Sequence, residues 1–169
     1  MSLFKIIPVF AGFLILQACG FHPLYGSGGA TASPEFAKIK IEPIADRLGQ
    51  LLHNRLLTTF NPRGGPRKPV YVLNTKLDEA SSSLALKKSA FATRANLTVT
   101  ATFQLIQISS GSTLYSGKSP ITVSYNILDS EFGTLVATKD ARSRAIREIS
   151  HGISTQLGVY FAQAPTRQN

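Results

Sequence analysis

The residues from Arg94 to Leu105, RANLTVTATFQL, alternate between apolar and polar side chains. Successive side chains of a β-strand point to opposite faces, so a period of two held this long predicts a strand with one buried face and one polar face. The polar positions carry Asn, Thr or Gln, and the apolar positions are Ala95, Leu97, Val99, Ala101, Phe103 and Leu105. The fold is therefore expected to contain a sheet with one face packed on a core.

The residues before this strand predict a neighbour for it. Val70–Glu79 is interpreted as a strand, and the segment Ala80–Phe91 is expected to extend both strands and then bend, with Lys87 and Lys88 near the tip. The apolar face of the earlier strand is formed by Tyr71, Leu73 and Leu77.

A third strand follows a tight turn. Ser109-Ser110-Gly111-Ser112 is typical of a hairpin connection, and Thr113–Tyr125 continues as a strand. Pro120 cannot donate a hydrogen bond to a ladder, so it indicates an edge position or a break.

Ahead of these strands the sequence predicts one more strand and a helix. Phe36–Glu42 alternates and is ended by Pro43, and Asp46 is placed to cap a helix that runs to Phe60. Asn61-Pro62 stops that helix, and the loop through residue 69 is expected to be irregular and exposed. The apolar residues of the helix, at helical spacing, are Leu48, Leu51, Leu52, Leu56 and Phe60.

After Asp129 the pattern is helical as far as residue 163. Leu135–Ala137 is either the first part of this helix or a separate turn, because Asp140 could cap a new helix. The arginines between residues 142 and 147 are interpreted as a solvated face. The apolar stripe of the helix consists of Ile146, Ile149, Ile153, Leu157 and Tyr160.

These elements predict an α+β fold. The expected architecture is a two-layer domain over residues 36–163, in the order β-α-β-β-β-α. One four-stranded, mostly antiparallel sheet has two helices packed on one face. Residues 164–169 are expected to be a disordered tail.

The N-terminus has the features of an export signal. Lys5 precedes an apolar run from Ile6 to Leu16, which is too short to cross a hydrocarbon core that needs roughly 20 residues. The stretch Leu16-Gln17-Ala18-Cys19-Gly20 resembles a bacterial lipobox. We therefore expect residues 1–18 to be removed and Cys19 to carry diacylglycerol and an N-acyl chain; the alternatives are an uncleaved anchor and an ordinary secretory signal.

The residues after Cys19 suggest a tether to a membrane. Residues 19–35 are rich in Gly, Ser and Thr, which is typical of a flexible linker, although Phe21–Gly26 is apolar enough to dock on the domain or a partner. Position 20 is Gly, and an Asp there would be the usual inner-membrane retention signal. The predicted location is therefore the periplasmic face of the outer membrane.

The charge balance points to an anionic partner. The chain has 18 Lys and Arg against 9 Asp and Glu, and losing Lys5 with the signal leaves +8 on the mature protein. In the cytosol such a balance would suggest nucleic acid. For an exported lipoprotein, phosphorylated lipid or an acidic protein surface is the expected partner, and nucleic acid is not.

No catalytic or metal-binding pattern is present in the sequence. His22, His53 and His151 have no metal-ligand spacing, and the single Cys19 allows neither an intramolecular disulfide nor a cysteine-based zinc site. No G-x-S-x-G elbow, paired carboxylates or glycine-rich phosphate loop stands out. We expect a protein that is not an enzyme and has no cofactor besides the lipid on Cys19.

Several stretches together resemble the LptE family of lipopolysaccharide-assembly lipoproteins, in the form found in alphaproteobacteria. Cys19–Gly26, CGFHPLYG, resembles the mature start of the family. Ser124–Ser130, SYNILDS, followed by Leu135–Ala137, resembles the stretch before its last helix, and Arg94–Thr98 is similar to its long central strand. The resemblance spans the mature chain and agrees in element order.

This resemblance implies a function. Such proteins form a one-to-one complex with the outer-membrane barrel LptD, lie largely inside its lumen as a plug, and help insert lipopolysaccharide (LPS) into the outer leaflet. A sheet face rich in Thr, Asn and Gln suits the polar interior of a large barrel. Basic side chains suit the phosphates of lipid A.

Four basic residues are candidates for LPS binding. Lys87 and Lys88 lie at the predicted bend, where the family presents basic residues, and Lys139 precedes the last helix near another such position. Arg94 opens the polar face of the long strand and could pair with a lipid phosphate or a barrel carboxylate. The competing interpretation of all four is an ordinary solvated charge.

Two other functions remain open at this point. The chain could be a generic envelope adaptor or pilot lipoprotein for another outer-membrane complex, which requires no lipid binding. A lipid-modifying hydrolase is the enzyme-class alternative, and it would require turnover that depends on a single Ser or His.

Overall fold

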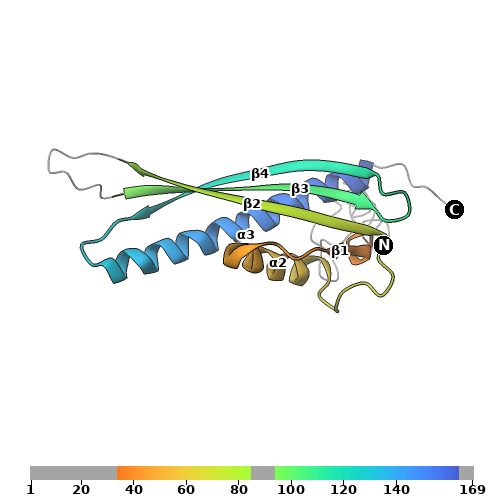
Figure 1. The fold of residues 1–169 in the computed structure, drawn as a ribbon, viewed down its shortest axis with the longest axis horizontal. Helices are drawn as coiled ribbons and strands as arrows, with labels where there is room; N and C mark the ends of the chain where they lie inside the picture. The colour runs from red at the N-terminus through yellow and green to blue at the C-terminus, as the bar shows by residue number, and fades with distance from the viewer. Residues whose placement is uncertain (1–33, 85–93, 164–169) are drawn as a thin grey trace, which may run out of the picture. The chain divides into compact units, whose positions relative to one another are not determined.

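The structure is a computed structural model, and it describes residues 34–84 and 94–163. The predicted order β-α-β-β-β-α is confirmed (Figure 1). The elements are the 3-10 helix η3 (Phe36–Lys38), β1 (Ile39–Ile41), α2 (Asp46–Phe60), β2 (Tyr71–Leu84), β3 (Arg94–Gln107), β4 (Thr113–Asn126) and α3 (Glu131–Gln163).

The four strands form one sheet in the order β1-β2-β3-β4. β1 pairs with β2 in parallel, and the other two pairings are antiparallel. β4 is therefore an edge strand, which explains how it accommodates Pro120. The β3–β4 connection is the predicted tight turn: Gly111 has a φ of +67°, and the Gln107 N–H donates to the Ser112 carbonyl over 2.9 Å.

The alternation in β3 is reproduced residue by residue. All six predicted inward positions, from Ala95 to Leu105, are buried, whereas the residues between them are half-buried or exposed. Both helices cover this apolar face of the sheet (Figure 1). The two-layer α+β prediction is confirmed.

The helix α3 lies against β4 and β3 with little space between them. A methyl group at Gly117 of β4 would meet Phe103 Cζ at 2.6 Å, and one at Gly152 of α3 would meet Ser119 Oγ at 2.6 Å. The predicted stripe of α3 is buried at Ile146, Ile149, Ile153 and Leu157, and Tyr160 is half-buried.

An aromatic cluster joins the C-terminal end of α3 to the start of the described chain. The ring of Phe36 stacks on that of Phe60 with 4.5 Å between centroids. Phe161 packs 5.8 Å from Phe36 and 5.5 Å from Tyr71. This cluster fixes the end of the sheet at which the polypeptide enters the fold.

Two details differ from the sequence predictions, and the extension that was expected for β2 is found. The first strand is only Ile39–Ile41, because Phe36 to Lys38 turns as a 3-10 helix that buries the Phe36 ring. Asp46 does not cap α2: it is the first residue of the helix, with a φ of +66°, and no side-chain bond caps this end. β2 continues past Glu79 to Leu84, in the direction in which extension was expected.

The open question about the last helix is settled in favour of one continuous helix. α3 runs 33 residues from Glu131, about 50 Å at 1.5 Å per residue. The Gly133 N–H donates to Ser130 Oγ over 3.3 Å, so Ser130 acts as the N-cap. Asp140 lies inside this helix and pairs with Arg144 instead of capping a new one.

Candidate functional site

The outer face of the sheet, on the side away from the helices, is polar over most of its length, with Val72, Ala80, Ile106 and Pro120 as apolar exceptions. Register pairs Asn96 with Ser124, and the Ser124 hydroxyl donates to Asn96 Oδ1 over 2.7 Å. One row along, the hydroxyls of Thr98 and Thr122 lie 3.0 Å apart. These short side chains bond to each other across strands, so this face presents hydroxyl and amide groups without long side chains between them.

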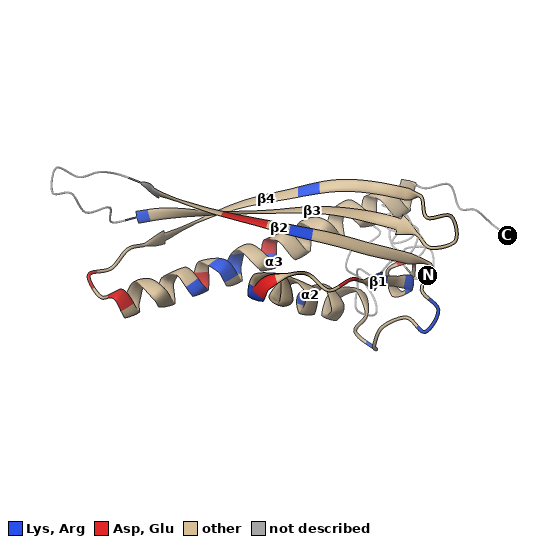
Figure 2. Cartoon of the chain, in the orientation of Figure 1, with Lys and Arg blue, Asp and Glu red and all other residues tan. Residues whose placement is uncertain are grey.

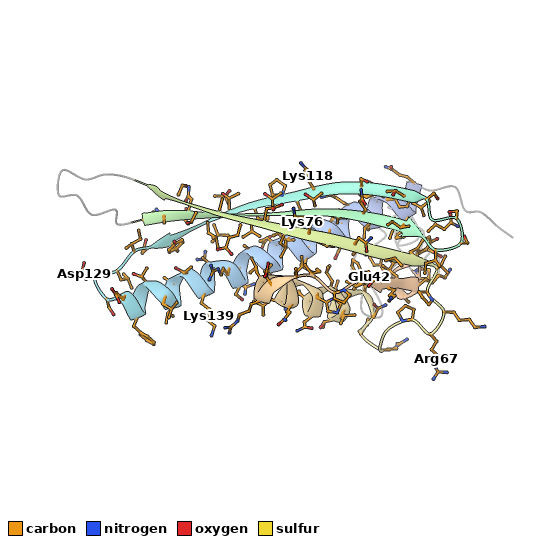
Figure 3. The ribbon with its side chains drawn as sticks, viewed as in Figure 1. Glu42, Arg67, Lys76, Lys118, Asp129 and Lys139 are labelled. Atoms are coloured by element: carbon orange, nitrogen blue, oxygen red, sulfur yellow. The ribbon has the colours of Figure 1, made fainter. Side chains whose placement is uncertain are left out.

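Two lysines are the basic groups in the middle of that face. Lys76 of β2 and Lys118 of β4 both pair in register with Thr102 of β3, so they flank it on opposite sides (Figure 3). Lys76 has a weak ion pair with Asp78, with 3.8 Å between Nζ and Oδ1. This row was not singled out in the sequence, because it becomes visible only once the register of three strands is known.

The structure places two of the four predicted LPS-binding residues, and it places them apart. Arg94 is the first residue of β3, is exposed, and shares the outer face with Asn96. The prediction that Lys139 precedes the last helix is wrong, because α3 already begins at Glu131. Lys139 is exposed on this helix and points away from the sheet (Figure 3). Lys87, Lys88 and the predicted lipidation site Cys19 lie outside the described residues.

The α3 arginines are more than a solvated face. Arg142 forms a two-pronged pair with Glu79 of β2: Nη2 lies 2.7 Å from Oε1, and Nε lies 3.2 Å from Oε2. Hydrogen bonding to this carboxylate raises the pKa of the Arg142 guanidinium further above its usual value. The pair joins the helix to a strand across the two layers. The two residues are 63 positions apart in the sequence, so the sequence alone does not show that they meet.

The first turns of α3 form an apolar surface that the sequence analysis missed. Phe132 is 75% exposed and Leu135 is 63% exposed, with Val136 and Leu128 about half exposed beside them. No residue of α3 before Ala141 is buried. A contiguous exposed patch of this kind is typical of a surface that contacts a partner.

The end of the fold nearest to the tether is held by polar contacts as well. The Tyr71 hydroxyl donates to Glu35 Oε2 over 3.1 Å, and Lys38 pairs with Glu35 Oε1 over 2.7 Å. Burial, together with the Glu35 charge, raises the pKa of the Tyr71 phenol. Glu35, the last residue of the predicted tether, is thus bonded into the fold.

No group of three or more His, Cys, Asp or Glu within residues 34–84 and 94–163 is arranged to hold a metal ion. The helices of the same ranges include none with the length and apolar character needed to span a membrane.

Comparison with known proteins identifies the family. A family model described as LptE, lipopolysaccharide-assembly, matches residues 36–158. The chain belongs to the LptE family. The expectation drawn from the sequence resemblance is thereby confirmed, and the role in LPS assembly is that of the family.

Solved structures with the same fold are lipoproteins of several bacteria. A candidate lipoprotein from Caulobacter crescentus superposes with a TM-score of 0.65 at 21% identity, covering 80% of this chain and 99% of that one. Rare lipoprotein B from Shewanella oneidensis has a TM-score of 0.51 at 16% identity, covering 72% and 97%. At these identities the likeness concerns the fold alone. No curated protein matches the sequence.

Proposed function

We propose that this LptE-family chain is an outer-membrane lipoprotein that forms a plug-and-barrel complex with LptD and assists both LptD assembly and the insertion of LPS into the outer leaflet. In this proposal Cys19 carries the lipid anchor on the periplasmic face. The observation that carries the proposal is the match of residues 36–158 to the LPS-assembly family.

The outer sheet face supports placement in a barrel lumen. The interior of a large outer-membrane barrel is polar, and short hydroxyl and amide side chains such as Thr98, Asn96 and Ser124 match it by hydrogen bonding without bulk. The exposed apolar turns at Phe132 and Leu135 add a surface for direct protein contact.

Direct LPS binding is the second part of the proposal. Arg94 is exposed at the start of the outer face, and a guanidinium there can form a charge-assisted bond with a lipid A phosphate. Lys139 lies in the helical layer. It would therefore contact a different LPS molecule from Arg94, or a different part of the same LPS molecule. Lys87 and Lys88 remain candidates by resemblance.

Affinity purification of the full-length protein tests the proposed complex. We expect LptD to co-purify at a one-to-one ratio, and depletion of the protein to leave LptD misassembled and LPS missing from the surface. Normal LptD and normal surface LPS after depletion would refute the proposal, and capture of a different barrel would support the adaptor or pilot function instead. Mass spectrometry of the native protein checks acylation of Cys19.

Direct LPS binding needs a separate test. Arg94→Gln is expected to weaken binding of purified LPS to the full chain, whereas Arg55→Gln on α2, with the same change of charge, should leave it unchanged. Equal binding by both variants and the unchanged chain would exclude Arg94.

A further inference from the structure

The loop from Asn61 to Val70 is the most basic segment of the described surface. It contains Arg63, Arg67 and Lys68, all exposed, and no acidic residue (Figure 2). Some cations of the described fold are paired, among them Lys38 with Glu35, Lys40 with Glu42 and Arg142 with Glu79, whereas others, such as Arg47 and Arg55, stand alone. None of the ion pairs within the described ranges involves the three cations of this loop.

Both ends of the loop are bonded to the segment where the chain enters the fold. The Asn61 side-chain amide donates to the Phe36 carbonyl over 3.4 Å, and the Val70 N–H donates to the Lys38 carbonyl over 3.0 Å. The stacked rings of Phe36 and Phe60 hold the same junction. The loop therefore lies beside the residues that follow the tether.

The loop is built to keep its cations away from the core. Three prolines, at positions 62, 66 and 69, limit its backbone freedom, and Gly64 turns the chain with a φ of +102°. Figure 3 shows Arg67 pointing away from the helices and the sheet. The charged groups are thus presented to whatever surface lies next to this end.

The length of chain before the fold brings the bilayer within reach of this end. Pro34 lies 15 residues after Cys19, a stretch that can span at most about 50 Å. An acylated Cys19 would therefore keep the loop within that distance of the bilayer. The several acyl chains expected on Cys19 would hold the chain at the bilayer by themselves, so a basic patch would act on the orientation of the domain; its attraction to anionic headgroups is worth about fivefold in affinity per cation near the surface.

We propose that the loop 61–70 is a membrane-contact surface whose three cations lie on the anionic phospholipid headgroups of the leaflet that holds the anchor. This inference rests on the lipid anchor of the proposed function. The contact would set how the domain is oriented relative to the bilayer, with the loop end towards the headgroups of the periplasmic leaflet. It involves neither the outer sheet face nor the first turns of α3.

Vesicle binding tests the proposal. The mature chain, residues 19–169 with Cys19→Ser so that no acyl group is added, is sedimented with vesicles of phosphatidylcholine alone or with 30% phosphatidylglycerol. We expect binding only to the anionic vesicles, weakened by raising the salt from 0.1 to 0.5 M because exposed charges are then screened. Absence of binding to anionic vesicles would overturn the proposal.

A charge-matched control isolates the loop. The variant Arg63→Gln, Arg67→Gln, Lys68→Gln should bind anionic vesicles at least tenfold more weakly. The variant Arg47→Gln, Arg55→Gln, Arg147→Gln loses the same charge from exposed positions on the helices and should bind nearly as well as the unchanged chain. Equal losses in the two variants would show an effect of net charge only, and would overturn the assignment to the loop.

Two further readouts separate this inference from the proposed function. If the loop variant loses LptD in purification but keeps vesicle binding, the loop contacts protein and the membrane proposal is wrong. Mass spectrometry of Cys19 reports on the anchor independently: an unacylated cysteine would remove the anchor on which the inference rests, whereas an acylated one with no vesicle effect would overturn only the loop contact.

Discussion

Neighbouring residues of β3 lie either in the core or in solvent, because adjacent side chains face opposite sides of the sheet. Val99 is completely buried between the layers. Thr102, three positions along, faces outward between Lys76 and Lys118. The same substitution at these two positions therefore enters two very different environments.

We predict that Val99→Asp unfolds the domain and Thr102→Asp does not. A carboxylate at position 99 would be buried without a partner, at a cost of about 4 kcal/mol or more in the free energy of unfolding. At position 102 it would lie between two lysines, so the change should stay within about 0.5 kcal/mol. Urea unfolding followed by circular dichroism measures both, and similar losses would contradict the outward placement of Thr102.

A second prediction at this scale concerns alkaline pH. The phenol of Tyr71 is uncharged when protonated, and burial together with Glu35 raises its pKa in the folded chain above the usual value of 10.0. The stabilising contribution is therefore complete below pH 10 and is lost as the pH rises through the raised pKa, because the unfolded chain releases its proton first. We expect the free energy of unfolding to fall above about pH 10.

Two variants check the origin of that fall. Tyr71→Phe should flatten the alkaline part of the stability profile, and Glu35→Gln should reduce its slope while the phenol remains. If Tyr71→Phe left the profile between pH 9 and 11 unchanged, Tyr71 would not be the group responsible.

At the scale of elements, the contact between α3 and β4 depends on glycine. An added Cβ at Gly117 would lie 2.6 Å from Phe103 Cζ and 2.7 Å from Gln156 Oε1. The Phe103 side chain is 1% exposed, so it has no free space into which to move. Helix and strand can therefore approach this closely only with glycine at position 117.

Gly117→Ala is accordingly expected to destabilise the domain by about 1–3 kcal/mol, the usual range for overpacking. In an unconstrained strand the same change would be favourable. Gly65→Ala is the matched control, because no atom lies within 4 Å of its added Cβ, and it should be neutral or slightly stabilising. Thermal unfolding of both variants measures the difference, and a neutral Gly117→Ala would mean that α3 shifts freely on the sheet.

Elements were predictable from the sequence where a local rule acts over many residues. The alternation of β3 and the apolar stripe from Ile146 to Leu157 each extend over several repeats. The positions that these patterns predicted to be apolar contacts are buried in the structure. The short β1 was overestimated because burial of the Phe36 ring turns the chain just before it. The cap expected at Asp46 is absent because Asp46 is itself the first residue of α2, with a φ of +66°.

Site features were less predictable because they combine distant segments. The packing of α3 on the sheet brings Arg142 to Glu79. The register of three strands places Lys76 and Lys118 on either side of one residue. The apolar residues at the start of α3 recur at the same helical spacing as residues that are buried. The sequence alone could therefore not show that they are exposed. The family resemblance was found because its short motifs need no tertiary information.

At the scale of the whole described unit, different surfaces gather at the two ends of the sheet. The aromatic cluster and the basic loop 61–70 lie at the end where β2 begins and β3 ends. Arg94 lies at the other end, where β3 begins and β4 leads into the exposed turns of α3. Strands of 14 residues separate these ends by about 46 Å. The proposed membrane contact and the proposed partner contact can thus be tested independently.

The exposed turns of α3 give the final prediction. Phe132→Ser combined with Leu135→Ser should leave the free energy of unfolding within about 1 kcal/mol of the unchanged chain, because both side chains are mostly in solvent. Truncating buried anchors of an interface typically costs 2 kcal/mol or more, so co-purification of LptD should fall at least about tenfold. Val159→Ser, on the same helix and 50% exposed, is the control and should leave the complex intact. A double variant that keeps both its stability and its full share of LptD would exclude these turns as the contact surface, and the polar face of the sheet would then have to hold the barrel alone.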